Sequence, residues 1–280
     1  MSDYRLVPCM QEATLEDYIV MFDAAYGRDD KLTVDYLKWE YCDNPDGKVI
    51  GFDAFKGNEL AGHYAIIPRT YALGSHKYKA ALSVNTATDP RHQGKGLFTL
   101  LANATYQAAA DQGVQFVVGV ANANSNPGFT KKLGFTELGK VWLYASLAGS
   151  PFHEDGKLSL DMNSDWLKWR LRNPSRQYSV WSHGDGSSSI LTKVRGPVFN
   201  IARVKTSRLP QDLGRECKIV KGLLRPALIP CYGENPSYGF KLPERMHPSP
   251  WHLIWKTLAS DFDASIAKHL VFDGISMDTF

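Results

Sequence analysis

One ten-residue segment, residues 89–98, constrains this chain more than any other. It reads Asp-Pro-Arg-His-Gln-Gly-Lys-Gly-Leu-Phe. A strand-like run, residues 81–88, leads into it, and a helix-like run, residues 97–112, follows it. Glycines let backbone N–H groups approach a ligand closely, and the first turn of a helix presents unpaired N–H groups with a partial positive charge. The segment therefore predicts an anion site, most often one for phosphate.

Two common phosphate motifs do not fit this segment. The dinucleotide fingerprint needs a third glycine where Thr99 stands, and the nucleoside-triphosphate loop needs a glycine at the position of Asp89 and a Ser or Thr at that of Gly96. What remains is Arg91-x-x-Gly94-x-Gly96 between a strand and a helix. A glycine-rich turn without a ligand is the alternative.

The remaining pattern resembles the coenzyme A pyrophosphate loop of the GNAT acyltransferases. Residues 122–135 strengthen the resemblance, because an Asn-rich loop, a short helix starting near Asn126-Pro127 and the stretch Leu133-Gly134-Phe135 follow the next apolar strand. The order of expected elements is also similar to that fold, an α/β (α+β) architecture. We expect helices at 14–25, 33–42, 97–112 and 126–133, and strands at 48–55, 60–73 (broken at Pro68), 78–88, 114–120 and 135–147.

A repeat indicates that the chain is a tandem of two such copies. Residues 36–41, Tyr-Leu-Lys-Trp-Glu-Tyr, precede Asn44-Pro45, and residues 166–171, Trp-Leu-Lys-Trp-Arg-Leu, precede Asn173-Pro174. Strand, turn and strand are expected after both, although chance and a common helix-ending turn would also explain the match. We expect a GNAT domain with the acyl-CoA site at 1–148 and a degenerate GNAT-like domain at 149–280. The second copy lacks the glycine loop, and a helix is expected there up to residue 224.

Composition excludes several other classes. The chain has 280 residues and a formal net charge of +3, too small to indicate nucleic-acid binding. The four cysteines form no CxxC pair and no zinc spacing, so no metal is expected. Neither a signal peptide nor an apolar run long enough for a membrane span is recognisable. We therefore expect a cytoplasmic protein with reduced thiols that binds neither membrane nor nucleic acid.

The GNAT resemblance implies an acyl-CoA site around the loop. N–H groups of residues 93–97 would hold the pyrophosphate, and the strand before the loop would pair with the pantetheine arm. The residues expected to bind the cofactor are Arg91, His92, Gln93, Gly94, Lys95, Gly96, Leu97, Asn122, Asn124, Ser125 and Phe129. The backbone at Thr86, Ala87 and Thr88 would position the acyl group and stabilise its oxyanion.

The resemblance also implies direct attack of an amine on the thioester, for which no acid or base is obvious. Candidate bases are His63, Glu40 and Asp89, each of which has a purely structural alternative. The tyrosine that often protonates the leaving thiolate in this family is replaced here by Thr130. A water molecule or Tyr144 would take its place, or no acid is needed.

The acceptor is expected between the two halves. The residues expected to bind it are Tyr26, Arg28, Trp39, Tyr64, Trp169 and Arg170, with Arg172 and Trp181 as further candidates for ion pairing and stacking. The tandem resemblance implies transfer of an acetyl or short hydroxyacyl group to a small amine. A nucleotide-linked amino sugar, such as a dTDP sugar for surface polysaccharide, is the leading acceptor, and a homodimer is possible. The alternatives are another amine, such as an aminoglycoside or peptide, or a non-catalytic acyl-CoA sensor.

Overall fold

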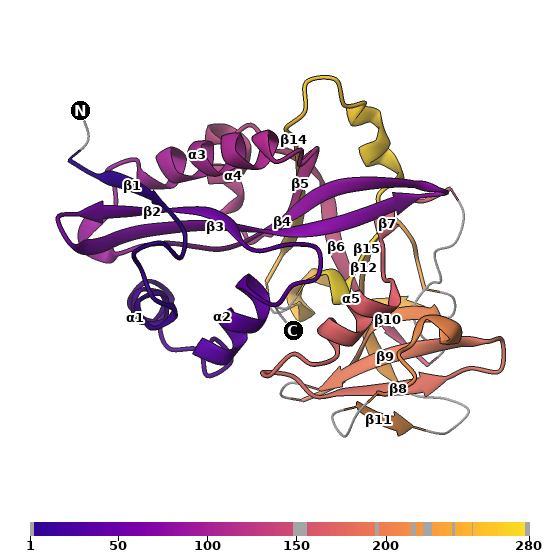
Figure 1. Cartoon of the computed structure of the whole chain (residues 1–280). Helices are drawn as coiled ribbons and strands as arrows, with labels where there is room; N and C mark the ends of the chain where they lie inside the picture. The colour runs from indigo at the N-terminus through magenta and orange to yellow at the C-terminus, as the bar shows by residue number, and fades with distance from the viewer. Residues whose placement is uncertain are drawn as a thin grey trace.

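The computed structural model describes residues 3–147, 156–193, 196–213, 217–220, 226–236, 239–247 and 249–277. Figure 1 shows a larger sheet with helices on both faces and a smaller sheet beside it, which holds much of the second half of the chain. One long strand runs from the first sheet into the second, so the described strands form one continuous mixed sheet.

The first half follows the expected order of elements, and the α/β class is confirmed. Its strands are β1 (Arg5–Pro8), β2 (Ile50–Lys56), β3 (Glu59–Leu73), β4 (His76–Thr88), β5 (Phe116–Ala121) and β6 (Thr136–Ser146). Its helices are α1 (Leu15–Tyr26), α2 (Val34–Tyr41), the 3-10 turn η1 (Pro90–His92), α3 (Leu97–Asp111) and α4 (Asn126–Lys132). Strands β1 to β4 pair antiparallel in sequence order, and β5 joins β4 in parallel.

Local sequence explains where α1 and α2 begin. The Thr14 hydroxyl accepts a hydrogen bond from the Asp17 N–H (3.2 Å), and the Asp17 carboxylate accepts one from the Thr14 N–H (2.8 Å). This capping box satisfies N–H groups that have no partner inside the helix. Thr33 caps α2 by accepting from the Tyr36 N–H at 3.1 Å. The first two helices therefore begin one residue after the threonines from which they were predicted.

The expected break of the strand at Pro68 is wrong, because β3 continues through it. Pro68 pairs with Ala81 of β4 on one side. On the other side, the pairing of β3 with β2 ends at Ile66. The missing N–H of the proline therefore removes no bond of the ladder at this point.

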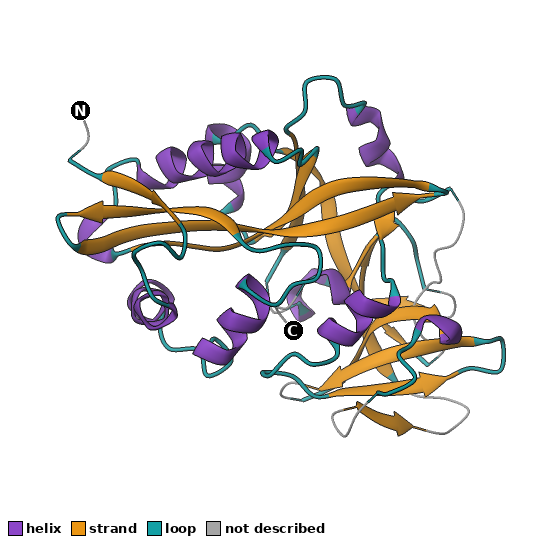
Figure 2. Ribbon diagram, viewed as in Figure 1, coloured by secondary structure: helices purple, strands orange, loops and turns teal. Residues whose placement is uncertain are grey.

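The first sheet is covered by helices on both faces (Figure 2). α3 and α4 lie on one face, where Leu97, Leu101 and Tyr106 pack with Tyr64 and Ile66 of β3 in one buried cluster. α1 and α2 lie on the other face, where a second and larger cluster extends into the second half of the chain. Neighbouring residues of β3 thus point to opposite layers.

The second half repeats the strand pairing of the first. Its helix and main strands are α5 (Ser164–Arg170), β8 (Tyr178–Ser182), β9 (Ser187–Lys193), β10 (Val198–Lys205), β11 (Cys217–Val220), β12 (Ala227–Tyr232) and β14 (Trp251–Thr257). Shorter elements are β7 (Ser159–Leu160), η2 (Thr206–Arg208), β13 (Gly239–Lys241), η3 (Glu244–Met246), η4 (Ala264–His269), β15 (Phe272–Asp273) and η5 (Gly274–Ser276). β8, β9 and β10 pair antiparallel and β12 is parallel to β10, just as β5 is parallel to β4. This shared pairing supports the duplication.

The two copies exchange strands where they meet. The central strand order is β4-β5-β14-β6-β12-β10. Equivalent strands of the two halves lie at equal distances from the middle of this order: β4 corresponds to β10, β5 to β12, and β6 to β14. β14 lies antiparallel between β5 and the first part of β6, whereas the second part of β6 pairs with β12. The strand predicted at 135–147 is β6, and the part of it that pairs with β12 belongs to the second sheet. Strands from both sides of the predicted boundary at residue 148 belong to one continuous sheet. The limits of the two copies therefore remain a prediction.

The repeated Trp residues meet at the centre of this arrangement. The indole N–H of Trp39 donates to the carbonyl of Trp169 (2.9 Å), and that of Trp169 donates to the carbonyl of Trp39 (3.0 Å). Their rings stack with centroids 4.3 Å apart. Two equivalent helices thus bind each other through equivalent groups, as expected for an approximate two-fold relation between the copies.

The predicted helix up to residue 224 is also corrected where the structure describes that segment. Residues Cys217–Val220 form β11, which pairs in parallel with β8. The β-branched pair Ile219-Val220 favours this extended conformation. Residues 211–213, where the predicted helix would begin, are not helical, and residues 214–216 and 221–224 lie outside the described residues.

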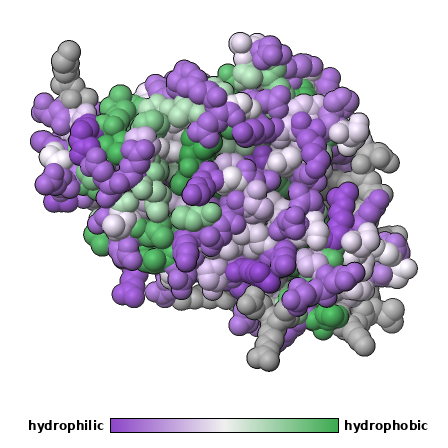
Figure 3. Space-filling view, viewed as in Figure 1, coloured by the Kyte–Doolittle hydropathy of each residue, from purple (hydrophilic) through white to green (hydrophobic). Residues whose placement is uncertain are grey.

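The surface facing the viewer in Figure 3 is mostly hydrophilic, with hydrophobic residues gathered over the region of the first sheet. Among the described helices, none is both long and apolar enough to cross a membrane.

Candidate functional site

β4 and β5 separate at one end of their shared ladder. They are paired from Ala80 and Phe116 to Ser83 and Gly119. β4 nevertheless continues to Thr88, and β5 to Ala121. The diverging strands leave an opening in the sheet, and the edges of β4 and β5 that face it lack a strand partner in the described chain.

A bulge in β4 lies at this opening. His63 of β3 pairs with Ala87, and Ala65 pairs with Val84, so Asn85 and Thr86 together oppose a single residue. Asn85 has a positive φ of 46°, a conformation that Asn tolerates better than most residues with a side chain. The bulge therefore bends β4 and presents Asn85 to α2, on one face of the sheet.

A cavity of about 810 Å³ occupies the opening, within the usual size range of small-molecule sites. One side is lined by the strand ends and α4, through Leu82, Val84, Thr86, Val120, Asn122 and Phe129. The other side is lined by the α1–α2 region, β3 and the second half, through Tyr26, Arg28, Tyr36, Glu40, Arg69 and Arg176. We refer to these as the strand side and the mouth.

The glycine loop follows directly from β4. Gly94 and Gly96 have positive φ values of 75° and 78°, and Gly96 is the N-terminal cap of α3 without a side-chain bond. Within the described chain, no backbone N–H from Gln93 to Thr99 donates to an acceptor. These consecutive donors at the start of a 15-residue helix form an anion cradle of the predicted kind.

The charged residues before the glycines have structural partners. Arg91 donates to Asp89 from Nε (3.0 Å) and Nη2 (2.7 Å), and it also pairs with Glu59. The bond to Arg91 holds the pKa of Asp89 below its usual value, which makes Asp89 a poor base. His92 is buried, and its Nδ1 lies 2.8 Å from the Tyr4 hydroxyl. Gln93 is exposed, and Leu97 is part of the core under α3.

The Asn-rich loop before α4 is held by its own side chains. Asn122 Oδ1 accepts from the N–H groups of Asn124 (3.0 Å) and Ser125 (2.9 Å). Asn122, Ser125 and Phe129 line the cavity, whereas Asn124 does not. Ser125 is the N-cap of α4, which begins at Asn126 as expected.

Neither Tyr144, the predicted candidate acid, nor Thr130, which stands at the position of the family's tyrosine, is placed to serve the cavity. Thr130 donates to the carbonyl of Asn126 at 2.9 Å, inside its own helix. Tyr144 lies in the part of β6 that belongs to the second sheet, and it donates to Asn235 at 2.5 Å. Neither side chain lines the cavity.

Glu40 is the one predicted base that reaches the cavity. Its side chain is only 2% exposed, yet it lies in the cavity wall. The Tyr36 hydroxyl donates to Oε1 (3.1 Å), and the Asn85 amide donates to Oε2 (2.8 Å). These two donors hold the carboxylate in the cavity wall, where its oxygens can accept a proton.

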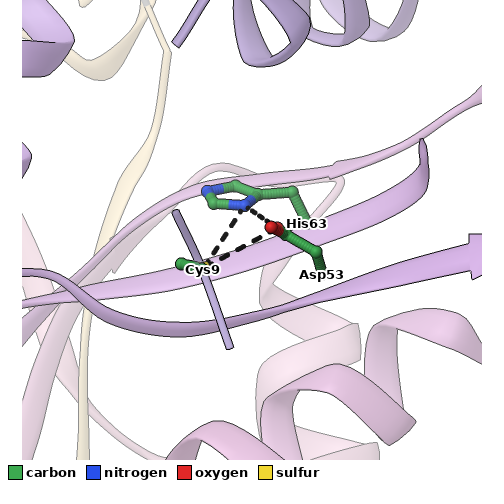
Figure 4. Close-up of side chains that lie close together, drawn as sticks. All are labelled: Cys9, Asp53 and His63. Atoms are coloured by element: carbon green, nitrogen blue, oxygen red, sulfur yellow. Dashed lines mark hydrogen bonds and ion pairs between the residues drawn. The ribbon is translucent and has the colours of Figure 1, made fainter. Parts of the chain in front are cut away.

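His63 is fully buried and lies away from the cavity. Its Nδ1 is 2.7 Å from Asp53 Oδ1, and Cys9 Sγ is 3.6 Å from the same nitrogen (Figure 4). Ligands of a tetrahedral zinc ion lie about 3.4 Å apart, so 2.7 Å fits a hydrogen bond rather than two ligands of one ion. The Tyr18 hydroxyl donates to Asp53 Oδ2 at 2.7 Å, and burial raises the pKa of the Cys9 thiol.

The predicted acceptor residues divide into two groups. Tyr26 and Arg28 line the mouth. The other four do not: Trp39 and Trp169 stack on each other, Arg170 is buried and donates to the Met277 carbonyl at 3.1 Å, and Tyr64 lies in the core under α3. Arg172 lines a separate groove between α2 and α5, and Trp181 is buried. The stack of Trp39 on Trp169 and the contact of the Arg170 guanidinium with the Trp39 ring therefore join the two halves.

Sequence analysis missed Asn85, Tyr36, Arg69 and Arg176, which all line the cavity. Two signals were available. Tyr36 lies four residues before Glu40 on a helix, where side chains meet, and an Asn inside a strand is unfavourable enough to mark a bulge. Arg69 and Arg176 carry no local signal, because only the packing of the two halves brings them to the mouth.

Residues 7–138 match the family model of the acetyltransferase (GNAT) domain. No curated protein sequence matches the chain. Solved structures with the same fold include a probable N-acyltransferase from Enterococcus faecalis, 10% identical, with a TM-score of 0.62 over 91% of this chain and 73% of that one.

Two further structures with this fold are GCN5-related N-acetyltransferases. The enzyme from Kribbella flavida is 14% identical, with a TM-score of 0.57 over 91% of this chain and 72% of that one. The enzyme from Anabaena variabilis is 11% identical, with a TM-score of 0.54 over 91% and 73%. At these identities the structures establish the fold, which extends over both halves of the chain.

Proposed function

Since residues 7–138 form a GNAT N-acyltransferase domain, which takes its acyl group from acyl-CoA, we propose that this chain acylates a small amine that also carries phosphate. A nucleotide-linked amino sugar, such as a dTDP sugar, has this chemistry. The observation that carries the proposal is the cavity at the divergence of β4 and β5, with the glycine loop beside the strand side and Glu40 in the mouth.

The strand side has unused hydrogen-bonding groups suited to acyl-CoA. The N–H groups of residues 93–99 would hold the pyrophosphate, with Lys95 adding positive charge. The Thr86 hydroxyl is buried and has no partner within the described chain. A buried hydroxyl without a partner costs roughly 1–3 kcal/mol, so a ligand that bonds to it recovers that energy. The oxyanion would form beside the backbone of Thr86 to Thr88.

The mouth supplies the second half of the reaction. The neutral amine attacks the thioester carbonyl, the new C–N bond forms, and the C–S bond breaks to release coenzyme A as a thiolate. Glu40 takes the proton that the amine nitrogen loses. Because Thr130 and Tyr144 are bonded elsewhere, the thiolate takes its proton from solvent.

The charges of the mouth support an acceptor with an anionic part. Four cationic side chains, Arg28, Lys31, Arg69 and Arg176, lie in the cavity wall with only two carboxylates, Asp29 and Glu40. The amine would sit at Glu40, and a phosphate or pyrophosphate would contact the cations at the rim. A polycationic acceptor, such as an aminoglycoside, would meet the wrong charge.

The test is release of coenzyme A thiol from acetyl-CoA and a short hydroxyacyl-CoA with a panel of amines. The panel contains nucleotide-linked 3- and 4-amino sugars, an aminoglycoside, polyamines and a lysine peptide. We expect release with a nucleotide-linked sugar. Release with the aminoglycoside alone would contradict the acceptor class. Binding of acyl-CoA without turnover on any amine would favour the non-catalytic sensor.

The loop itself is tested by Gly94→Glu, with Gly74→Glu as the matched control. Both glycines have positive φ and open space around the position of a Cβ atom, but Gly74 lies in the distant β3–β4 turn. A carboxylate at residue 94 would repel the pyrophosphate, so we expect acyl-CoA affinity to fall about tenfold or more in that variant alone. An equal loss in both variants would remove the loop from the cofactor site.

A further inference from the structure

A chain of hydrogen bonds connects the buried His63 to the carboxylate in the mouth. Asp53 Oδ1 lies 2.7 Å from His63 Nδ1, and His63 Nε2 lies 2.9 Å from the Tyr41 hydroxyl. The Asn85 amide nitrogen lies 3.2 Å from the same hydroxyl and 2.8 Å from Glu40 Oε2. The chain thus crosses from β2 and β3 through α2 to the bulge of β4.

The carboxylates at its two ends set the direction of every bond. Ionised Glu40 only accepts, so Asn85 must turn its NH₂ group toward it, and the same nitrogen then donates to the Tyr41 oxygen. Among the described residues, the Tyr41 hydroxyl has one other hydrogen-bond partner, His63 Nε2, so the Tyr41 proton points to that nitrogen. That nitrogen must be bare, so the imidazole is neutral and carries its proton on Nδ1, facing Asp53.

The surroundings of the chain agree with this direction. Asp53 also accepts from the Tyr18 hydroxyl (2.7 Å) and lies 3.7 Å from the Cys9 thiol, so every neighbour presents a donor to it. Burial, with the nearby charge of Glu40, raises the pKa of Tyr41 well above its ordinary value, which keeps the phenol protonated as a donor. Asp53 and His63 are fully buried, and neither lines the cavity.

We propose that Asp53 and His63 are positioning residues for acyl transfer, which act through Tyr41 to orient the Asn85 amide and thereby hold Glu40 toward the acceptor amine. The role rests on the proposed function, because it requires Glu40 to receive the proton. His63 is accordingly not the base. A change at Asp53 or His63 reaches Glu40 because each group in this chain of hydrogen bonds has one arrangement of donors that satisfies its neighbours.

Asp53→Asn reverses the chain with almost no change of shape. The new amide donates to His63 Nδ1, the ring proton moves to Nε2, and the Tyr41 proton turns toward Asn85. The Asn85 oxygen must then take the place of its nitrogen, beside the Glu40 carboxylate, which loses its amide donor. Tyr41→Phe is the second variant, because it interrupts the chain and leaves the Asp53–His63 bond intact.

Steady-state kinetics test the proposal. We expect kcat to fall about 10- to 100-fold in both variants, with KM for acyl-CoA unchanged, since the loop is not touched. Added to Glu40→Gln, neither change should reduce kcat further, because both act through that carboxylate. Tyr232→Phe is the matched control: it removes a hydroxyl that donates to the Leu138 carbonyl at 3.1 Å, away from the cavity.

The outcomes separate the two proposals. Full activity of Glu40→Gln would overturn the role of Glu40, and with it the positioning role. A weak Glu40→Gln variant together with fully active Asp53→Asn and Tyr41→Phe variants would overturn the positioning role alone. If Asp53→Asn or Tyr41→Phe lowered kcat further in the Glu40→Gln background, the effect would be a general structural one. The same conclusion would follow if Tyr232→Phe lowered kcat equally.

A spectroscopic measurement tests the chain in the complete protein without any acceptor. Nitrogen NMR of the His63 ring should show a neutral imidazole protonated on Nδ1, which changes to Nε2 in Asp53→Asn. A wild-type ring protonated on Nε2, or on both nitrogens at neutral pH, would overturn the proposal. If the ring shows the expected tautomer but the protein turns over no amine, the proposed catalytic function would be wrong. The hydrogen-bond chain would then have a structural role only.

Discussion

Glu40 and Arg170 occupy the same place in two copies of one helix, after the shared Leu-Lys-Trp of α2 and α5. Both are 2% exposed, but their surroundings differ. Glu40 faces the cavity with Tyr36 and Asn85 as donors, while Arg170 lies over the Trp39 ring, 5.7 Å from its centroid. A single residue thus distinguishes the two helices: the proposed base lies on α2, and the cation that contacts the Trp39 ring lies on α5.

Glu40→Gln tests this assignment. The amide keeps the size of the side chain but cannot take a proton from an amine, so we expect kcat to fall roughly 10²-fold or more. Equilibrium binding of acyl-CoA should not change, because Glu40 lies in the mouth. Asp35→Asn, an exposed carboxylate of the same helix, should retain wild-type turnover. If Glu40→Gln had the same kcat as the wild type, Glu40 would not be the base.

At the scale of single elements, the bulge in β4 gives the site its geometry. Without it, the strand would continue in regular register beside β3, and Asn85 would not face α2. The left-handed conformation of Asn85 is the backbone cost of this arrangement. Its two hydrogen bonds, to Glu40 and Tyr41, help to offset that cost.

Replacements of Asn85 separate the backbone from the side chain. Asn85→Gly removes the side chain but suits the positive φ, whereas Asn85→Ala removes it and keeps the strain. We expect the free energy of unfolding, from urea titration, to be about 1–2 kcal/mol lower in the alanine variant than in the glycine variant. Both should lose activity, since both leave Glu40 without its amide donor. Equal stability of the two would mean that the φ of residue 85 is not strained.

On the scale of the whole molecule, the exchanged strands make the two copies one folding unit. β14 fills the gap between β5 and β6, and its Trp255 stacks on Phe116 with ring centroids 3.9 Å apart. The second half therefore supplies part of the core of the first sheet as well as part of the cavity wall. Loss of that half removes structure from the first.

A fragment of residues 1–148 tests this dependence. It would expose the edges of β5 and β6 and the ring of Phe116, so we expect aggregation or a non-cooperative thermal transition. The complete chain, melted by circular dichroism under the same conditions, is the control. A soluble, monomeric fragment with a cooperative transition would show that β14 is dispensable for folding of the first half.

The chain order of elements in the first half could be read from local pattern, because caps, glycines and apolar periodicity act within a few residues. The glycine loop, the start of α4 and the repeat of the Trp helix were predicted for that reason. The strand through Pro68 was not, since the tolerance of a proline depends on whether a neighbouring strand reaches it. The segment 217–220 was misread because a short run with β-branched residues is compatible with either conformation until a partner strand is known.

The candidate site divides in the same way. By itself the sequence predicted an anion site at the N–H groups of residues 93–97, since a glycine-rich turn into a helix belongs to one short segment. It also predicted Glu40 as one of three candidate bases. Only the tertiary structure placed Glu40 in the cavity wall, buried His63 and Asp53 outside that wall, and brought Arg69 and Arg176 to the mouth. It also decided that β14 completes the first sheet. The physical reason is that burial and strand exchange join residues far apart in the chain, and no local pattern encodes which distant surface a side chain will meet.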